Sequence, residues 1–188
     1  MCGIFAILNQ TSIADKQLQN FSKGNNRGPE YSELNVFSKN VVMGFHRLAI
    51  NGLTEQSNMP MRIKNCILIC NGEIYNFKQI YDMLGYEGET CNDCEVIIHL
   101  YKEVGFEQML QLLDGVFAFV LLDNESNSLY VARDCLGVRP LFQNRYNGKF
   151  TFSSELKMMN CPKYPKVFQP GTFVYYKKYA QQSWHEVL

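Results

Sequence analysis

The sequence lacks several features that would place it in a specialised class of protein. It has 18 Lys and Arg against 18 Asp and Glu, so no excess of one charge favours a nucleic-acid partner. The longest apolar runs, Cys2–Leu8 and Val116–Leu122, have seven residues each. A membrane-spanning helix needs roughly 20. We therefore expect neither nucleic acid nor a membrane as a partner.

Cysteine is also sparse, and its number is odd. Seven cysteines in 188 residues do not suggest a small secreted protein held together by disulfides. The apolar segment at residues 2–8 has no charged stretch before it, and Asn9 and Gln10 do not form a small-residue cleavage site. A signal peptide is therefore not indicated. We expect a cytoplasmic chain whose thiols stay reduced.

What the sequence does contain is a series of short strand-like segments. They are rich in β-branched and aromatic residues and are bounded by Gly, Asn or Asp. Asn147-Gly148 predicts a hairpin turn between two of them. No repeat or linker divides the chain, so we expect a single domain over residues 1–188. The predicted strands are Cys2–Leu8, Val41–Phe45, Cys66–Cys70, Val116–Leu122, Ser128–Arg133, Lys149–Ser153 and Thr172–Lys177.

Apolar residues at helical spacing predict helices at Ala14–Ser22, Tyr75–Leu84 and Asp93–Glu103. Loops are expected at 24–33, 51–62 and 136–140, and loops of that length often carry function. Two stacked, mainly antiparallel β-sheets flanked by helices are the natural packing of such a set. The fold class we expect is therefore α+β.

Cys2 is the first residue that could carry chemistry. Removal of Met1, which a small second residue permits, would give Cys2 a free α-amino group. Such an amine titrates at about pH 8, so it can take the thiol proton and make the sulfur a nucleophile without a histidine base. Taken alone, a small apolar side chain at the start of a strand is the more ordinary interpretation.

Asn71 and Gly72 follow the predicted strand Cys66–Cys70. A carboxamide followed by a glycine N–H at a strand end is a suitable pair of donors for a developing oxyanion. By itself, Asn-Gly in this place is more often a simple turn.

Arg47 and Asp93 are two charged candidates. Arg47 ends an apolar strand, where an arginine can bind a substrate carboxylate in bidentate fashion or form a structural ion pair. Asp93 begins a predicted helix, where its simplest role is that of an N-cap.

These features occur together in one family. In their order along the chain, six segments resemble the glutaminase domain of glutamine-hydrolysing asparagine synthetase, most closely its eukaryotic members. That domain is a class II glutamine amidotransferase of the N-terminal-nucleophile hydrolase type, which implies an αββα arrangement of two sheets between helices. The resemblance covers practically the whole chain. Its main segments are Met1–Phe5, Arg27–Glu30, Gly44–Ile50, Asn71–Asn76, Asp114–Phe119 and Arg133–Phe142.

The resemblance implies catalytic roles for three residues. Cys2 would be the nucleophile, and its α-amine would move the proton. Asn71 and the backbone N–H of Gly72 would form the oxyanion hole. The reaction implied is hydrolysis of L-glutamine to glutamate and ammonia through a thioester on Cys2.

The resemblance also implies a binding site for the amino-acid part of glutamine. Arg47 would bind the α-carboxylate, and Glu73 with Asp93 would bind the α-ammonium group. The backbone of four further residues would line the site: Leu48, Ala49, Ile50 and Asn51.

Some positions depart from the family pattern without removing any of these groups. Asn26 stands where the family usually has His, and Glu30 where it usually has Asp. Asn51-Gly52 replaces an apolar–acidic pair, and Met59-Pro60 replaces Gln-Pro. These changes affect the loops around the expected glutamine pocket.

The largest departure from the family is a missing motif. Asparagine synthetase also has an ATP-dependent synthetase domain, and the phosphate-binding loop of that domain is absent from residues 1–188. We expect the ammonia to go to such a domain or subunit, where aspartate and ATP give asparagine. ATP and Mg²⁺ would belong there, and we expect no cofactor or metal in this domain. A homodimer is a further expected option.

Two alternatives remain open. Cys91 and Cys94 form a C-x-x-C motif, and Cys66 and Cys70 could supplement it in a metal or thiol-redox site. The spacing of these cysteines and of the three histidines is irregular for zinc. The second alternative is a non-catalytic interaction module that keeps the amidotransferase fold without turnover.

Overall fold

The computed structural model describes residues 1–50, 52–159, 163, 165–179 and 183–187. Within them the chain forms two six-stranded sheets in which every paired strand is antiparallel to its neighbour. The expected α+β class, with two antiparallel sheets flanked by helices, is confirmed.

The first sheet has the strand order β10-β8-β9-β1-β3-β2. Its strands are β1 (Gly3–Leu8), β2 (Tyr31–Phe37), β3 (Val41–Arg47), β8 (Phe142–Tyr146), β9 (Lys149–Ser153) and β10 (Lys166–Val167). The second sheet has the order β12-β11-β7-β6-β5-β4. Its strands are β4 (Met61–Ile63), β5 (Cys66–Ile74), β6 (Gly115–Asp123), β7 (Ser128–Arg133), β11 (Phe173–Lys178) and β12 (Trp184–Val187).

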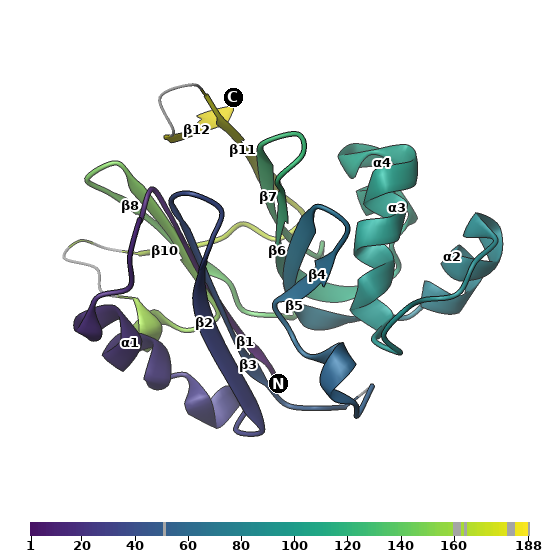
Figure 1. The fold of residues 1–188 in the computed structure, drawn as a ribbon, viewed down its shortest axis with the longest axis horizontal. Coiled ribbons are helices and arrows are strands. Elements are labelled where there is room, and N and C mark those ends of the chain that lie inside the picture. The colour runs from purple at the N-terminus through teal and green to yellow at the C-terminus, as the bar shows by residue number, and fades with distance from the viewer. Residues whose placement is uncertain (51, 160–162, 164, 180–182, 188) are drawn as a thin grey trace.

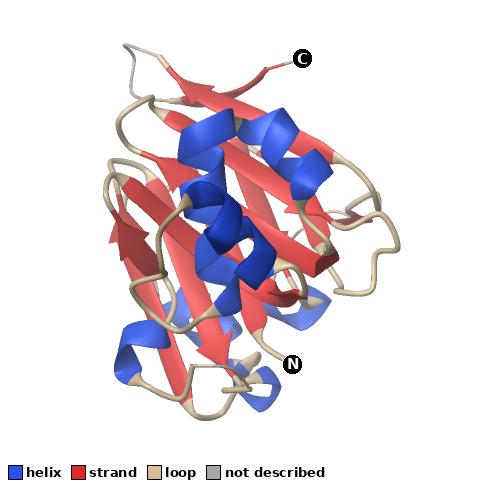
Figure 2. Cartoon of the chain, turned by 90° about the vertical axis from the view of Figure 1, so that its right-hand side faces the viewer, coloured by secondary structure: helices blue, strands red, loops and turns tan. Residues whose placement is uncertain are grey.

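The helices lie on the two outer faces, so the molecule has four layers (Figure 1). Helix α1 (Asp15–Ser22) lies beside the first sheet. Helices α2 (Phe77–Leu84), α3 (Val96–Val104) and α4 (Phe106–Leu112) lie beside the second, in front of its strands in Figure 2. Four single 3₁₀ turns complete the set: η1 (Asn25–Arg27), η2 (Glu55–Ser57), η3 (Asp93–Glu95) and η4 (Leu156–Met158). Among the described residues, no helix combines the length and the apolar character needed to cross a membrane.

Strand β1 shows how the sequence pattern builds two separate cores. Alternate side chains of a strand point to opposite faces of its sheet. Ile4, Ala6 and Leu8 therefore join the large core that contains the residues of the second sheet. Phe5 and Ile7 face outward, into a smaller core that includes Phe21 of α1 and Met158 of η4. Strand β1 is thus buried on both faces, and Cys2 directly precedes it.

The structure corrects several sequence expectations. Strand β5 runs on to Ile74, so Asn71 and Gly72 lie inside the strand and not after it. Strand β2 begins at Tyr31, within the expected loop 24–33. Helix α2 begins at Phe77, two residues later than expected, and α4 was not expected.

Asp93 is not the N-cap that its position suggested. The cap of η3 is Asn92, whose side-chain oxygen accepts a hydrogen bond from the Cys94 N–H at 2.9 Å. The Asp93 carboxylate instead accepts one from the backbone N–H of Ile74 at 2.7 Å. This bond ties η3 to the end of β5 and places the carboxylate next to Asn71 and Gly72 in the fold.

Candidate active site

A small cavity lies where the ends of β1, β3 and β5 meet the turn η3, and we call it the strand-end cavity. Its volume is about 50 Å³. Charged residues of both signs, thiols and side-chain amides contribute to its wall. The wall residues that could take part in catalysis or substrate binding include Cys2, Arg47, Asn71, Gly72, Glu73, Asp93, Cys94 and Arg139.

Cys2 is fixed in this cavity through its backbone. The Arg27 Nε–H donates to the Cys2 carbonyl at 2.7 Å, and the Arg27 guanidinium is itself held by Glu155 at 3.2 Å. The Cys2 Sγ lies 3.4 Å from both the backbone N and the backbone O of Leu48. Burial raises the pKa of the Cys2 thiol, and the Leu48 N–H and the positive charges of the chain terminus and Arg47 oppose this only in part. With Met1 attached, the thiol is therefore a poor nucleophile at neutral pH.

Asn71 brings a buried amide donor to this cavity. It lies in β5 opposite Ala118 of β6, and only 2% of it is exposed. Within the described part of the chain, its buried side-chain nitrogen Nδ2 has no hydrogen-bond partner. Leaving a buried donor unpaired costs about 1–3 kcal/mol, so such a group commonly marks a place where another molecule binds.

Gly72 follows Asn71 at a point where no larger residue fits. A Cβ added there would lie 2.7 Å from the Val116 carbonyl oxygen and 2.8 Å from the Phe117 Cβ. Glycine therefore allows β5 and β6 to stay paired right up to the cavity. The Gly72 carbonyl accepts a hydrogen bond from the Cys94 thiol at 3.7 Å.

Arg47 supplies a buried positive charge at the end of β3. Its Nη1 donates to the Asn58 Oδ1 at 2.6 Å and to the Thr54 carbonyl at 3.2 Å, and its Nη2 donates to the Gly52 carbonyl. The guanidinium thus organises the loop after β3 as well as contributing to the cavity. These three partners are neutral oxygen atoms.

Two acids supply the negative charge. Asp93 is 5% exposed and bonded to Ile74 as described above. Glu73 is more open, with its side chain 36% exposed, and pairs with the Arg139 guanidinium at 3.0 Å. The cavity therefore presents cations and anions together, which is the pattern that a zwitterionic amino acid requires.

The loop residues expected to line the site are only partly brought to it. Leu48 and Ile50 lie in the wall of the cavity. Ala49 does not, and its N–H donates to the Glu30 carboxylate at 2.8 Å. Asn51, the fourth expected residue, lies outside the described residues.

Sequence reasoning did not assign a role to Arg27, Asn58 or Arg139. Arg27 and Arg139 lie in segments that carry the family resemblance, but their contacts join residues far apart in the chain. Asn58 is reached by Arg47 only because the loop after β3 folds back. No local pattern could have predicted these contacts.

In the described part of the chain, the cysteines do not form the cluster that the metal alternative needs. The six cysteines of the described residues are free thiols, and Cys91 is exposed whereas Cys94 is buried. In the same part of the chain, no three His, Cys, Asp or Glu side chains are grouped so that they could hold a metal ion. The Cys94 thiol instead belongs to the wall of the strand-end cavity.

The family model that matches this chain and its curated relatives agree on one family. A family model described as "Glutamine amidotransferase domain" matches residues 1–184. Asparagine synthetase [glutamine-hydrolyzing] of Gallus gallus is 43% identical over 150 residues, which are 76% of this chain and 26% of that protein. A probable asparagine synthetase [glutamine-hydrolyzing] of Acanthamoeba polyphaga mimivirus is 36% identical over 184 residues, 93% of this chain and 34% of its own. The chain thus spans about a quarter to a third of the length of these relatives.

Two solved structures share the fold. Glutamine phosphoribosylpyrophosphate amidotransferase from B. subtilis aligns with a TM-score of 0.75 at 20% identity, over 99% of this chain and 49% of that one. A structure described as the allosteric regulatory enzyme of purine biosynthesis aligns with a TM-score of 0.79 at 21% identity, over 99% and 48%. At this identity the likeness concerns the fold alone.

Proposed function

Because this chain belongs to the family of glutamine amidotransferase domains, we propose that it hydrolyses L-glutamine to glutamate and ammonia. The observation that carries the proposal is one cavity that holds both a thiol, on Cys2, and a buried amide donor without a partner, on Asn71. A nucleophile and an oxyanion donor that face the same space are the two groups that acyl transfer needs most.

The reaction would proceed in two steps through the Cys2 sulfur. The thiol gives its proton to the α-amine of Cys2, and the thiolate attacks the side-chain amide carbon of glutamine. The carbonyl oxygen takes the electron pair as an S–C bond forms, and it accepts hydrogen bonds from Asn71 Nδ2 and the Gly72 N–H. The C–N bond then breaks, and the leaving nitrogen takes the proton from the α-amine. Water attacks the resulting thioester by the same route and releases glutamate.

Recognition of glutamine would use the charges of the strand-end cavity. Arg47 binds the α-carboxylate, because a guanidinium can hold a carboxylate through two parallel hydrogen bonds. Glu73 and Asp93 bind the α-ammonium group. Leu48 and Ile50 shape the wall, and we also assign the backbone of Ala49 and Asn51 to the surroundings of the substrate.

Met1 would have to be removed before this chemistry can begin. With Met1 attached, the Cys2 nitrogen is an amide and cannot take a proton near neutral pH. Met1 also belongs to the wall of the cavity. At about 50 Å³ the cavity holds one or two water molecules and not a glutamine. Removing Met1 both frees the amine and opens the space.

The ammonia would be passed on to an acceptor. The similarity to glutamine-hydrolysing asparagine synthetases favours a synthetase domain or subunit that makes asparagine from aspartate and ATP. ATP and Mg²⁺ would serve that reaction, whereas glutamine hydrolysis needs no cofactor beyond the groups named above. We place this activity in the cytoplasm, because the described thiols are all free, and we include a homodimer as an expected assembly.

The test uses chain prepared with Cys2 as its first residue. Incubated with glutamine and quenched in acid, it should release ammonia and carry one glutamyl group on Cys2 by mass spectrometry. The Cys2→Ser variant should give neither signal in this assay. If calorimetry shows that glutamine binds while no ammonia is released, the domain is the non-catalytic module and the proposal fails.

A further inference from the structure

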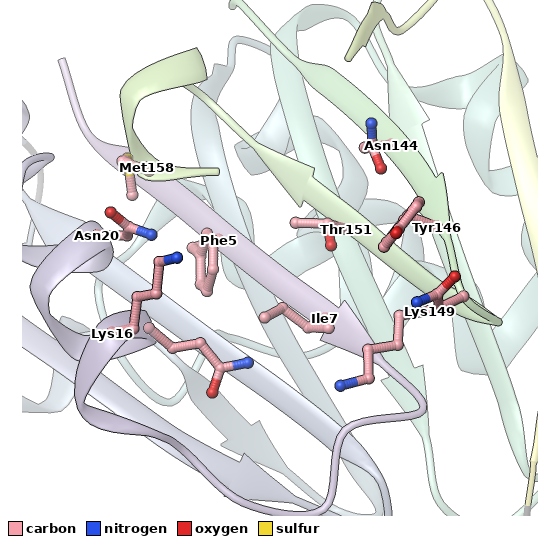
Figure 3. Close-up of a pocket in the computed structure, with 11 residues that line it drawn as sticks. Phe5, Ile7, Lys16, Asn20, Asn144, Tyr146, Lys149, Thr151 and Met158 are labelled. Atoms are coloured by element: carbon pink, nitrogen blue, oxygen red, sulfur yellow. The ribbon is translucent and has the colours of Figure 1, made fainter. Parts of the chain in front are cut away.

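A large cavity lies away from the strand-end cavity, on the outer face of the first sheet. We call it the outer pocket. Its volume is about 480 Å³, within the range of roughly 300–1,000 Å³ typical of small-molecule sites. Residues of β1 form its floor, and α1 and the β8–β9 hairpin form its sides (Figure 3).

The outer pocket exists because α1 covers only part of this sheet face. Phe5 and Ile7 are the outward-facing residues of β1, and Phe21 of α1 packs against Phe5 with ring centroids 5.9 Å apart. Beyond this contact, Thr151 of β9 faces a space that no helix of the described chain fills. Phe5 and Ile7 are themselves buried, so the open space lies above them, between α1 and the β8–β9 hairpin.

The rim of the outer pocket is cationic. Lys16 on α1 and Lys149 on β9 contribute to its wall, and no Asp or Glu does. Within the described residues, neither lysine forms an ion pair with a carboxylate. Lysines whose charge is unmatched beside a cavity favour an anionic ligand.

The position of Lys149 is held by neutral groups only. Its Nζ donates to the Gln10 Oε1 at 2.5 Å. The Gln10 side chain in turn donates to the Ser12 carbonyl at 2.6 Å and to the Gln17 Oε1 at 3.4 Å. This chain of hydrogen bonds links the hairpin to the start of α1 and holds the amine at the rim without neutralising it.

Hydrogen-bond donors accompany the charge. The Asn20 oxygen is occupied by the Lys23 amine at 2.6 Å, and Figure 3 shows the Asn20 nitrogen directed toward Phe5. Asn144 and Tyr146 add polar groups on the opposite side. We propose that the outer pocket binds a small organic anion with a flat apolar body, such as an aromatic carboxylate. The flat body would lie in the space between α1 and the β8–β9 hairpin, and the anionic group between Lys16 and Lys149.

This proposal is independent of glutamine hydrolysis, and its test measures binding alone. The ¹⁵N-labelled chain is titrated with 2-naphthoate and, separately, with 2-naphthamide, which has nearly the same shape and no charge. We expect 2-naphthoate to shift the amide resonances of Phe5, Asn20 and Thr151, and to bind about three- to thirtyfold more tightly than the amide, as two partly exposed charge pairs predict.

Three variants sharpen the test. Lys16→Met combined with Lys149→Met should lower 2-naphthoate affinity to that of the amide. Thr151→Trp, which fills the pocket and keeps both lysines, should abolish binding of both compounds. Lys78→Met, on exposed α2, is the matched control and should change nothing.

Several results would overturn the proposal. They are no binding at millimolar concentration, equal affinity for the acid and the amide, and unchanged affinity in the double lysine variant. A further one is a shift of the same resonances with protein concentration alone, which would assign this face to contact between copies of the chain.

Discussion

The two cavities of this molecule differ in the ways that separate a reaction site from a binding site. The outer pocket is almost ten times larger, yet it has charge of one sign and no thiol. The strand-end cavity is small, but it brings together a thiol, an unpartnered amide donor, two arginines and two acids from separate parts of the chain. Size alone would favour the outer pocket, whereas the convergence of complementary groups favours the strand-end cavity as the proposed site of chemistry.

The two cavities also differ in how their charges are supported. In the strand-end cavity each charged group named above has a protein partner: Asp93 accepts from Ile74, Glu73 pairs with Arg139, and Arg47 holds the loop after β3. Groups held in this way lose little entropy when substrate binds, so they can act as a rigid template. In the outer pocket, Lys149 is held by a neutral amide oxygen, so its charge is not matched by an acid there.

The largest expected difference between the cavities concerns Cys2. With Met1 removed, Cys2→Ala should lower glutamine turnover by about 10⁴-fold or more, because Cys2 is the thiol that carries its own terminal amine to move the proton. The melting temperature should change by only a few degrees. Cys135→Ser is a matched control, since that thiol is exposed and outside both cavities. The Lys16→Met, Lys149→Met double variant should also keep full turnover. If it loses activity as Cys2→Ala does, the separation of the two cavities is wrong.

A smaller effect is expected at Asn71. Asn71→Ala removes one oxyanion donor and should lower kcat by about 10²–10³-fold with little change in KM. Because the Nδ2 is buried and has no partner in the described chain, its removal should leave the melting temperature equal or higher. Paired steady-state kinetics and calorimetric melting check both parts. A variant that is both unstable and fully active would mean that Asn71 has a structural role.

Arg47 should act on binding more than on chemistry. Its contacts with the α-carboxylate exist before and during the reaction, so Arg47→Ala should raise KM by about 10- to 100-fold. Because the guanidinium also holds Thr54 and Asn58, some stability should be lost as well, and Arg47→Lys should restore part of it. Arg62→Ala is the control, since Arg62 forms an exposed ion pair with Glu33 outside the cavity. A fall in kcat at constant KM would contradict the assigned role.

The smallest effect concerns Glu95, a buried acid that supports the turn carrying Asp93. Burial raises its pKa, but hydrogen bonds from His99, Thr90 and Glu89 outweigh burial and lower the pKa to about 2. Because folding lowers the pKa of Glu95, its carboxylate stabilises the folded state at pH values above about 4.3, which is its pKa in the unfolded chain. That stability, up to about 3 kcal/mol, is lost as the pH falls toward 2.

Glu95→Gln should therefore be less stable than the natural chain at pH 7 and should lose less stability between pH 4.5 and 2. Urea unfolding at several pH values measures this difference, and Glu107→Gln, an exposed position on α4, serves as the control. If the free energies of unfolding of the natural chain and of Glu95→Gln change in parallel with pH, the Glu95 carboxylate is not held as described.

The elements that could be predicted from sequence are those with a strong repeating pattern. Strands β1, β6 and β9 have runs of apolar or β-branched residues, and each was expected within one residue of its actual bounds. Strand β2 was missed because most of its residues are exposed or half-exposed, so that Glu33 and Asn35 give it the composition of a loop. Helix α4 has only seven residues and follows α3 directly after Gly105, so its pattern is too short to stand out.

The candidate site also contains residues that the sequence could predict and contacts that it could not. Cys2, Arg47 and Asn71 were named in advance because their residue types suit the chemistry and their segments resemble a known family. The cap assigned to Asp93 was wrong, because a local rule for helix starts cannot predict a hydrogen bond to a strand nineteen residues earlier. The outer pocket was not expected at all. It depends on how much of the sheet α1 leaves uncovered, and this is a property of packing and not of any one segment.

The central claim is that Cys2 acts through its own free amine in the strand-end cavity. It is tested most directly by comparing two preparations of the same chain, one that begins with Cys2 and one that keeps Met1. Both are verified by intact mass and assayed for ammonia release from glutamine. We predict turnover only in the chain that begins with Cys2, because Met1 blocks the amine, contributes to the wall of the cavity and leaves a thiol whose pKa is raised by burial. Full turnover by the chain that keeps Met1 would contradict the claim.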